Sequence, residues 1–257
     1  MASTAGEVST EFDGGVAVIT INRPEAKNAV NAAVAQQIAA AVDELDNRKD
    51  LVVGVLTGAG GTFSAGMDLK AFLNGEAPTF EDRGFGGLVE KPPRKPLIAA
   101  VEGFALAGGF ELALGCDLIT SAEDARFGLP EVRRGLAAAA GGLLRLPRRI
   151  PYHAAMEIAL TGEKVPAKRM HELGLVASLT ESGGALAGAR ELAGQIAANG
   201  PLAVAATKQV IVESPDWPSD EAFARQSEVL GPVFASADAQ EGPAAFAEKR
   251  APVWKGE

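Results

Sequence analysis

The sequence is poor in the residues from which metal sites and disulfides are built. Its 257 residues include one cysteine, Cys116, and two histidines, His153 and His171. A single cysteine forms no intrachain disulfide, and two isolated histidines with one cysteine do not supply the four ligands of a typical zinc site. We therefore expect no bound metal and a reducing compartment, the cytoplasm.

Basic residues and long apolar runs are also scarce. Lys and Arg number 24 against 33 Asp and Glu, which gives a net charge of −9. Nucleic-acid-binding proteins usually present a basic face, so we expect no such partner. The most apolar stretch, residues 96–120, is interrupted by Glu102, Glu111 and Asp117. The first seven residues lack the basic and apolar regions of a signal peptide, so we expect neither membrane association nor a leader.

Several common catalytic signatures are missing. No G-x-G-x-x-G follows an apolar strand, no G-K-[ST] phosphate loop occurs, and no G-x-S-x-G elbow is present. These absences argue against a Rossmann dinucleotide site, a P-loop nucleotide site and an α/β-hydrolase nucleophile.

The residues that are present predict an α/β fold. Apolar runs at 16–21, 51–57, 97–101 and 117–121 predict strands, and Asn31 can cap a helix that reaches about residue 46. Residues 73–96 are rich in Gly and Pro, which predicts a mobile polar loop with a short helix. Strands alternate with helices as far as residue 121, and helices dominate after residue 141. The predicted late helices are 142–150, 152–160, 167–173, 184–198, 202–212, 220–234 and 238–249.

Three blocks of sequence are candidates for a catalytic site. They are Phe63-Ser64-Ala65-Gly66-Met67-Asp68-Leu69, the run 103–113 with its pair Gly108-Gly109, and Ala125-Arg126-Phe127-Gly128-Leu129-Pro130-Glu131. Gly108 and Gly109 lack a Cβ and open a predicted helix, so a ligand can approach free N–H groups there. Such donors, with one from the first block, would stabilise a developing enolate oxygen.

Two glutamates lie within these blocks. Glu111 falls one turn into an otherwise apolar helix, where a carboxylate is unexpected on burial grounds, and Glu131 follows Pro130. Two carboxylates in one apolar site can hold different pKa values, so that one accepts a proton and the other donates one.

The three blocks, in this order and spacing, resemble the crotonase superfamily, also called the enoyl-CoA hydratase/isomerase family. The resemblance extends from Ile21-Asn22-Arg23-Pro24 and Lys27-Asn28-Ala29 to the run 246–253 near the end of the chain. It implies a spiral core of repeated ββα units over residues 1–200. It also implies a helical C-terminal region over residues 201–257 that assembles trimers or hexamers.

The resemblance also implies roles for individual residues. The backbone N–H groups of Met67 and Gly108 match the family's oxyanion hole, and Glu111 and Glu131 match the two glutamates of its hydratases. The substrate would be an acyl-CoA thioester, with no tightly bound cofactor. Residues that match CoA-binding positions are Arg23, Lys27, Ala65, Gly66, Asp68, Leu69 and, across a subunit interface, Lys249.

Retention of both glutamates favours an enoyl-CoA hydratase, but three alternatives stay open. Residues 108–114 and 143–147 resemble the carnitinyl-CoA dehydratase branch of the family. An enoyl-CoA isomerase would need mainly one carboxylate, so that it would tolerate replacement of Glu131. A non-catalytic acyl-CoA-binding protein would tolerate replacement of both glutamates.

Overall fold

The computed structural model describes residues 6–257. Residues 1–5, on which much of the expectation about a leader rests, lie outside the described residues. Within residues 6–257, no helix combines the length and the apolar composition that a membrane crossing requires.

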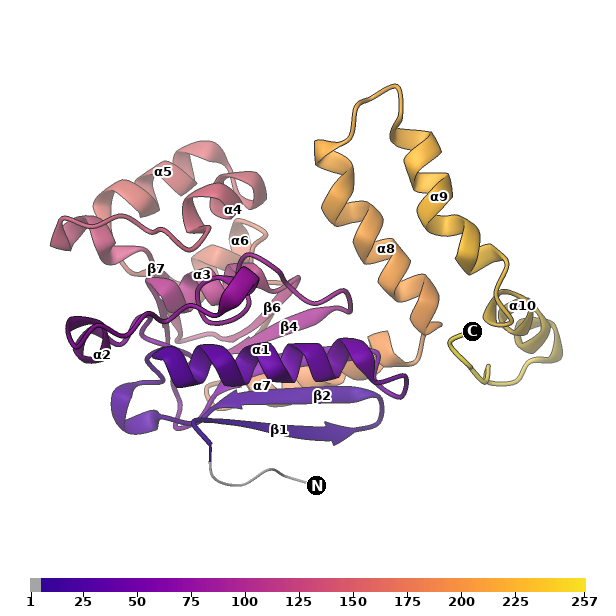
Figure 1. Ribbon diagram of the computed structural model, residues 1–257, viewed down its shortest axis with the longest axis horizontal. Coiled ribbons are helices and arrows are strands. Elements are labelled where there is room, and N and C mark those ends of the chain that lie inside the picture. Colours follow the sequence, from indigo (N-terminus) through magenta and orange to yellow (C-terminus); the bar gives the residue numbers. More distant parts are fainter. Residues whose placement is uncertain (1–5) are drawn as a thin grey trace.

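A six-stranded sheet forms the centre of the molecule (Figure 1). Its strand order is β1-β2-β3-β4-β6-β9, with β1 antiparallel to β2 and all other neighbours parallel. Because parallel strands are covered on both faces, their residues are almost all apolar. The strands are β1 (Val8–Asp13), β2 (Val16–Ile21), β3 (Val53–Gly58), β4 (Leu97–Val101), β6 (Leu118–Ala122) and β9 (Ser178–Thr180).

Helices cover the two faces of this sheet, and the two-residue period of the strands decides which side chain meets which helix. Helix α1 (Ala32–Asn47) begins at Asn31, whose side chain accepts a hydrogen bond from the N–H of Val34. It packs in the larger core cluster with Ile19, Leu56 and Ala99. Helix α7 (Ala185–Ala197) covers the other face, where Val18, Val55 and Ile98 meet a row of three alanines, Ala185, Ala189 and Ala193 (Figure 1).

A second, three-stranded sheet lies beside the first. It contains β5 (Phe104–Leu106), β7 (Arg126–Gly128) and β8 (Val165–Pro166). Each of β4 and β6 continues into a strand of this small sheet and then into a helical segment, which is a ββα repeat. A parallel bridge from Ser64 to Ala105 places the segment after β3 in the same position. The three candidate blocks therefore meet along this small sheet.

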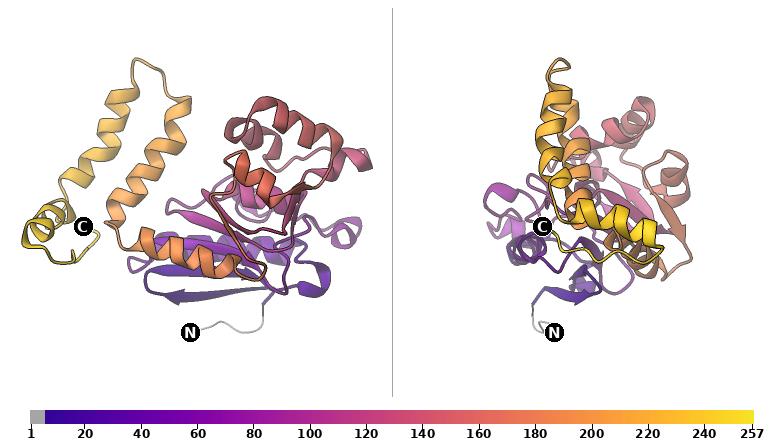
Figure 2. Two further views of the ribbon diagram at one scale, coloured as in Figure 1. Left: turned by 180° about the vertical axis from the view of Figure 1, so that it is seen from behind. Right: turned by 90° about the vertical axis from the view of Figure 1, so that its right-hand side faces the viewer.

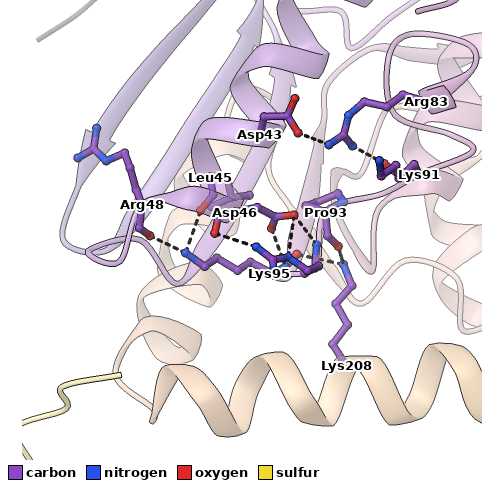
Figure 3. Close-up of polar contacts among 10 residues, drawn as sticks. Asp43, Leu45, Asp46, Arg48, Arg83, Lys91, Pro93, Lys95 and Lys208 are labelled. Atoms are coloured by element: carbon purple, nitrogen blue, oxygen red, sulfur yellow. Dashed lines mark hydrogen bonds and ion pairs between the residues drawn. The ribbon is translucent and has the colours of Figure 1, made fainter. Parts of the chain in front are cut away.

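The remaining helices form a cap and an arm. The cap contains α4 (Gly142–Arg149), α5 (Tyr152–Thr161) and α6 (Ala167–Glu172). Residues 201–257, which we call the C-terminal arm, contain α8 (Pro201–Glu213), α9 (Ala222–Phe234) and α10 (Asp238–Glu248). The arm projects away from the sheet in the left view of Figure 2. Lys208 of α8 fastens it to the core by donating hydrogen bonds to Pro93 O and Lys95 O (Figure 3) and to Asp117 Oδ2.

The sequence-based predictions of the long elements are confirmed, five strands were missed, and the prediction of a polar loop at residues 73–96 is wrong. Four strands of two or three residues, β5, β7, β8 and β9, were not predicted because such short segments give little periodicity. Strand β1 was not predicted because its sequence, VSTEFD, is mostly polar. Residues 73–96 are not uniformly polar: beyond α2 (Leu69–Leu73) and the 3-10 turn η2 (Glu81–Arg83), the chain buries Arg83, Phe85, Leu88 and Val89. Their glycine-rich context hid these core side chains.

Candidate active site

The first block presents a free backbone donor at Met67. Its neighbours are bonded to Val30: the N–H of Val30 donates to Gly66 O at 2.8 Å, and the N–H of Asp68 donates to Val30 O at 2.9 Å. The N–H of Met67 itself has no acceptor within residues 6–257. Gly66 has φ +96°, and a Cβ there would lie 3.0 Å from the nitrogen of Gly108. The first and second blocks thus touch at a point where only glycine fits.

The second block presents a second free donor at Gly108, the first residue of α3 (Gly108–Gly115). The first N–H groups of a helix have no partner within it, and that of Gly108 has no acceptor elsewhere in residues 6–257. Ala107 precedes it with φ +53°, and its carbonyl accepts from the N–H groups of Phe110 and Glu111. A Cβ at position 108 would collide with the ring of Phe85, and one at Gly109 with Ser64 O.

Glu111 is buried in the first turn of α3, with 3% of its surface exposed. Its Oε1 accepts hydrogen bonds from the N–H groups of Ala140 at 2.7 Å and Gly142 at 2.9 Å. Burial raises the pKa of this carboxyl group, and the two hydrogen bonds and the charge of Arg145 oppose that rise. The two backbone donors fix the orientation of the carboxyl group.

Glu131 lies in the 3-10 turn η3 (Pro130–Arg134) of the third block. Its Oε2 is buried and has no hydrogen-bond partner within residues 6–257. Burial raises the pKa of Glu131, and the negative charge of Glu111 raises it further, while the charge of Arg134 lowers it. The structure therefore brings the two glutamates within electrostatic reach of each other. A buried carboxylate oxygen without a partner is costly and typical of a functional group.

The expected CoA-binding residues fall into two groups. Lys27 and Ala65 are adjacent, because the N–H of Ala65 donates to Lys27 O at 3.0 Å, and the Lys27 side chain is exposed. Leu69, 48% exposed, begins α2 nearby. The charges of Arg23 and Asp68, by contrast, are engaged with each other at 3.0 Å.

Arg23 and Asp68 also hold the local chain together. Arg23 pairs with Glu7 and donates to Ala29 O, and Asp68 accepts from the N–H groups of Lys70 and Ala71 at the start of α2. Both side chains are mostly buried, so they support this surface and are not open to a ligand.

Lys249 lies outside this cluster. It follows α10 at the far end of the C-terminal arm, whereas α2 lies on the opposite side of the molecule (Figure 1). One chain does not bring Lys249 to the other candidate residues, so any contact with CoA requires a second copy.

The structure adds residues that the sequence did not indicate. Ala140 and Gly142 hold Glu111, and Phe85 covers Gly108. The pair Gly141-Gly142 was a visible signal for close backbone approach, since a Cβ at Gly142 would lie 3.0 Å from Oε1 of Glu111. No feature of residues 73–96 indicated that Phe85 reaches α3. Residues 6–257 contain no cluster of three or more His, Cys, Asp or Glu side chains that would suit a metal ion.

Comparison of the sequence with known proteins identifies the family. A family model described as enoyl-CoA hydratase/isomerase matches residues 11–257. The chain belongs to the enoyl-CoA hydratase/isomerase family. The enoyl-CoA hydratase EchA19 of Mycobacterium tuberculosis is 43% identical over 249 residues, which cover 94% of each chain. A carnitinyl-CoA dehydratase of Salmonella typhi is 42% identical over 252 residues, which cover 95% of this chain and 96% of the relative.

Solved structures confirm the crotonase-type fold expected for this family. The crystal structure of an enoyl-CoA hydratase from Mycobacterium tuberculosis H37Rv superposes with a TM-score of 0.97 at 60% identity, over 98% of this chain and 100% of that one. The prediction of family membership from the three sequence blocks is therefore confirmed. The names of these relatives, hydratase and dehydratase, agree with the expectation of a hydro-lyase.

Proposed function

We propose that the protein catalyses reversible addition of water to the double bond of a 2-enoyl-CoA thioester. The observation that carries this proposal is the pair Glu111 and Glu131. Glu111 is buried and Glu131 is half-buried, and both have raised pKa values. The buried Oε2 of Glu131 has no hydrogen-bond partner within residues 6–257. A hydratase needs one group to take a proton from water and another to give a proton to carbon.

In the proposed mechanism the thioester carbonyl lies between the free N–H groups of Met67 and Gly108. Loss of one such donor costs about 3 kcal/mol of transition-state stabilisation in other enzymes. The glutamates hold a water molecule, which attacks the β-carbon as one of them accepts its proton. The resulting enolate takes a proton at the α-carbon, and we assign Glu131 as the donor of this proton. The two carboxyl groups titrate as a coupled pair.

The CoA moiety is part of the substrate, and the proposal requires no tightly bound cofactor. Lys27, whose exposed ammonium has no hydrogen bond or ion pair within residues 6–257, is the candidate partner of a phosphate. Leu69 at the start of α2 is the candidate contact of the pantetheine chain. Ala65 and Gly66 precede Leu69 in the chain, and the N–H of Ala65 donates to Lys27 O.

A carnitinyl-CoA dehydratase activity is the second candidate, and the Salmonella typhi relative favours it. An isomerase or a non-catalytic acyl-CoA-binding protein has less support. Neither requires a second carboxylate with a raised pKa, and Glu131 is such a group.

Loss of the ultraviolet absorbance of the conjugated enoyl thioester tests the proposal directly. We expect the wild type to hydrate crotonyl-CoA and Glu111→Gln and Glu131→Gln each to lose at least about a hundredfold in kcat. Lys27→Gln is the matched control, in which KM for the thioester rises while kcat stays near wild type. Turnover of crotonobetainyl-CoA alone would favour the second candidate. Binding of CoA esters without turnover of either would exclude both lyases.

We also propose that the C-terminal arm assembles trimers, or hexamers of two trimers. Its large apolar side chains are exposed, with Phe223 at 82%, Phe234 at 74% and Phe246 at 87%. Exposed aromatic rings on one region are typical of an interface. Light scattering at micromolar concentration should give a mass near three or six chains, and a monomer would contradict the proposal.

A further inference from the structure

Arg145 is a half-buried cation without a carboxylate partner. It lies in the first half of α4, and no Asp or Glu side chain within residues 6–257 approaches it closely enough for a salt bridge. Burial of a charged group without a partner is unfavourable unless other interactions compensate it. The surroundings of Arg145 therefore need an explanation.

The guanidinium connects two segments of the candidate site. Its Nη2 donates a hydrogen bond to Val89 O, in the buried part of residues 73–96. Four residues before Val89, Phe85 lies against Gly108. The other side of the guanidinium lies against Gly141, since a Cβ there would collide with Nη1. Gly141 is the residue between the two N–H donors, Ala140 and Gly142, that hold Glu111.

The charge of Arg145 also reaches Glu111. It favours the ionised form of that carboxyl group and so opposes the rise in pKa caused by burial. Two other charged groups lie near this pair: Glu131 from η3 is within electrostatic reach of Glu111, and Arg149 from α4 is within reach of Arg145. Cys116, at the end of α3, is neutral because burial raises the pKa of its thiol.

We propose that Arg145 is a positioning residue for Glu111. It holds the peptide at 140–142 through its contact with Gly141 and favours the ionised form of Glu111, which can accept a proton from water. It also joins this peptide to the segment that carries Phe85, so that the position of Glu111 relative to the N–H of Gly108 stays fixed. The inference rests on the proposed hydratase function, because it assigns Glu111 the role of proton acceptor.

Arg149 provides a matched control on the same helix. It lies four residues later and is more exposed than Arg145, and its Nη1 donates to Cys116 O at 3.1 Å. It is not among the groups that act on Glu111. Arg149→Gln therefore removes a similar charge and a similar hydrogen bond without changing the environment of Glu111.

The pH dependence of kcat/KM for crotonyl-CoA distinguishes positioning from general stability. In Arg145→Gln, the pKa of Glu111 rises, so the acidic limb of the profile should move to higher pH. We expect kcat to fall by up to about a hundredfold, with little change in KM. Arg145→Lys keeps the charge, so its acidic limb should stay near wild type while kcat falls. Arg149→Gln should leave both the limb and kcat unchanged.

A measurement without turnover separates this inference from the proposed function. Carbon-13 NMR of the Glu side-chain carboxyl groups, assigned with Glu111→Gln, follows the titration of Glu111 directly. We expect its pKa to be higher in Arg145→Gln than in Arg145→Lys, even if crotonyl-CoA is not a substrate. Unchanged Glu111 titration, or an equal shift in Arg149→Gln, would overturn the proposal. If Arg145→Gln does not fold, Arg145→Lys alone tests the proposal. An acidic limb at the wild-type pH with a lowered kcat in Arg145→Lys supports the proposal. An unchanged kcat in Arg145→Lys overturns it.

Discussion

Two clusters of buried charge in this protein differ in how completely they are satisfied. The ammonium of Lys208 donates to Pro93 O and Lys95 O (Figure 3) and to Asp117 Oδ2, which also accepts from the N–H of Leu97. Within residues 6–257, the buried Oε2 of Glu131 has no hydrogen-bond partner, and the backbone N–H groups of Met67 and Gly108, in the other two candidate blocks, have no acceptor. The first cluster holds the C-terminal arm on the core. The second leaves polar groups open for a ligand, which is how we distinguish a site from a structural network.

The largest effect should come from removing charge in the unsatisfied cluster. Glu131→Gln should lower kcat by about a thousandfold, yet its free energy of unfolding should equal or exceed that of the wild type. The native carboxylate is poorly solvated, so its neutral replacement relieves an unfavourable interaction. Urea titrations beside the absorbance assay measure both quantities. A large loss of stability would mean that Glu131 is a structural carboxylate.

The satisfied cluster should show the opposite response. Lys208→Met removes the charged donor to Asp117, which keeps only the N–H of Leu97, and leaves two carbonyls without a donor. This should cost about 3 kcal/mol of stability. Both tryptophans, Trp217 and Trp254, lie in the C-terminal arm, so their fluorescence reports on the arm, while circular dichroism reports on the whole chain.

The variant Lys208→Met should therefore release the arm before the core unfolds, with the fluorescence transition at lower urea than the dichroism transition. The double variant with Asp117→Asn should cost less than the sum of the single changes, because the pair is coupled. Coincident transitions in Lys208→Met would show that Lys208 does not hold the arm separately.

The stability of the protein should depend on pH through the two glutamates of the unsatisfied cluster. Glu111 and Glu131 have folded-state pKa values above the ordinary value of 4.5. Such groups contribute stability below about pH 4.5 that is lost as pH rises through the folded-state pKa. The difference in unfolding free energy between Glu131→Gln and wild type should therefore grow from pH 4 to pH 8 in favour of the variant. A difference that does not change with pH would contradict the raised pKa.

The smallest effect concerns the backbone that presents the Gly108 donor. Ala107 has φ +53° and ψ −131°, a conformation that glycine adopts more readily than alanine. Ala107→Gly should therefore stabilise the protein by about 1 kcal/mol. Ala113→Gly, inside the same helix, should instead destabilise it by at least about 1 kcal/mol. Thermal unfolding of both variants compares them, and a loss of stability in Ala107→Gly would show that position 107 is not strained.

Sequence alone determined much of this protein. The long strands and helices follow from apolar periodicity, and α1 begins where Asn31 predicts it, because its side chain can accept from a free N–H group. The three blocks were sufficient for family membership. Glu111 was visible as a carboxylate in an apolar helix, which is a local signal that needs no knowledge of distant residues.

Tertiary structure decided the rest, because it depends on contacts between residues far apart in the chain. Only folding brings Ala140 and Gly142 to Glu111, Phe85 to Gly108, and Lys208 to Asp117. It also showed that the charges of Arg23 and Asp68 are engaged with each other. The sequence indicates which groups can react, whereas their partners, burial and pKa values depend on packing, which no local pattern encodes.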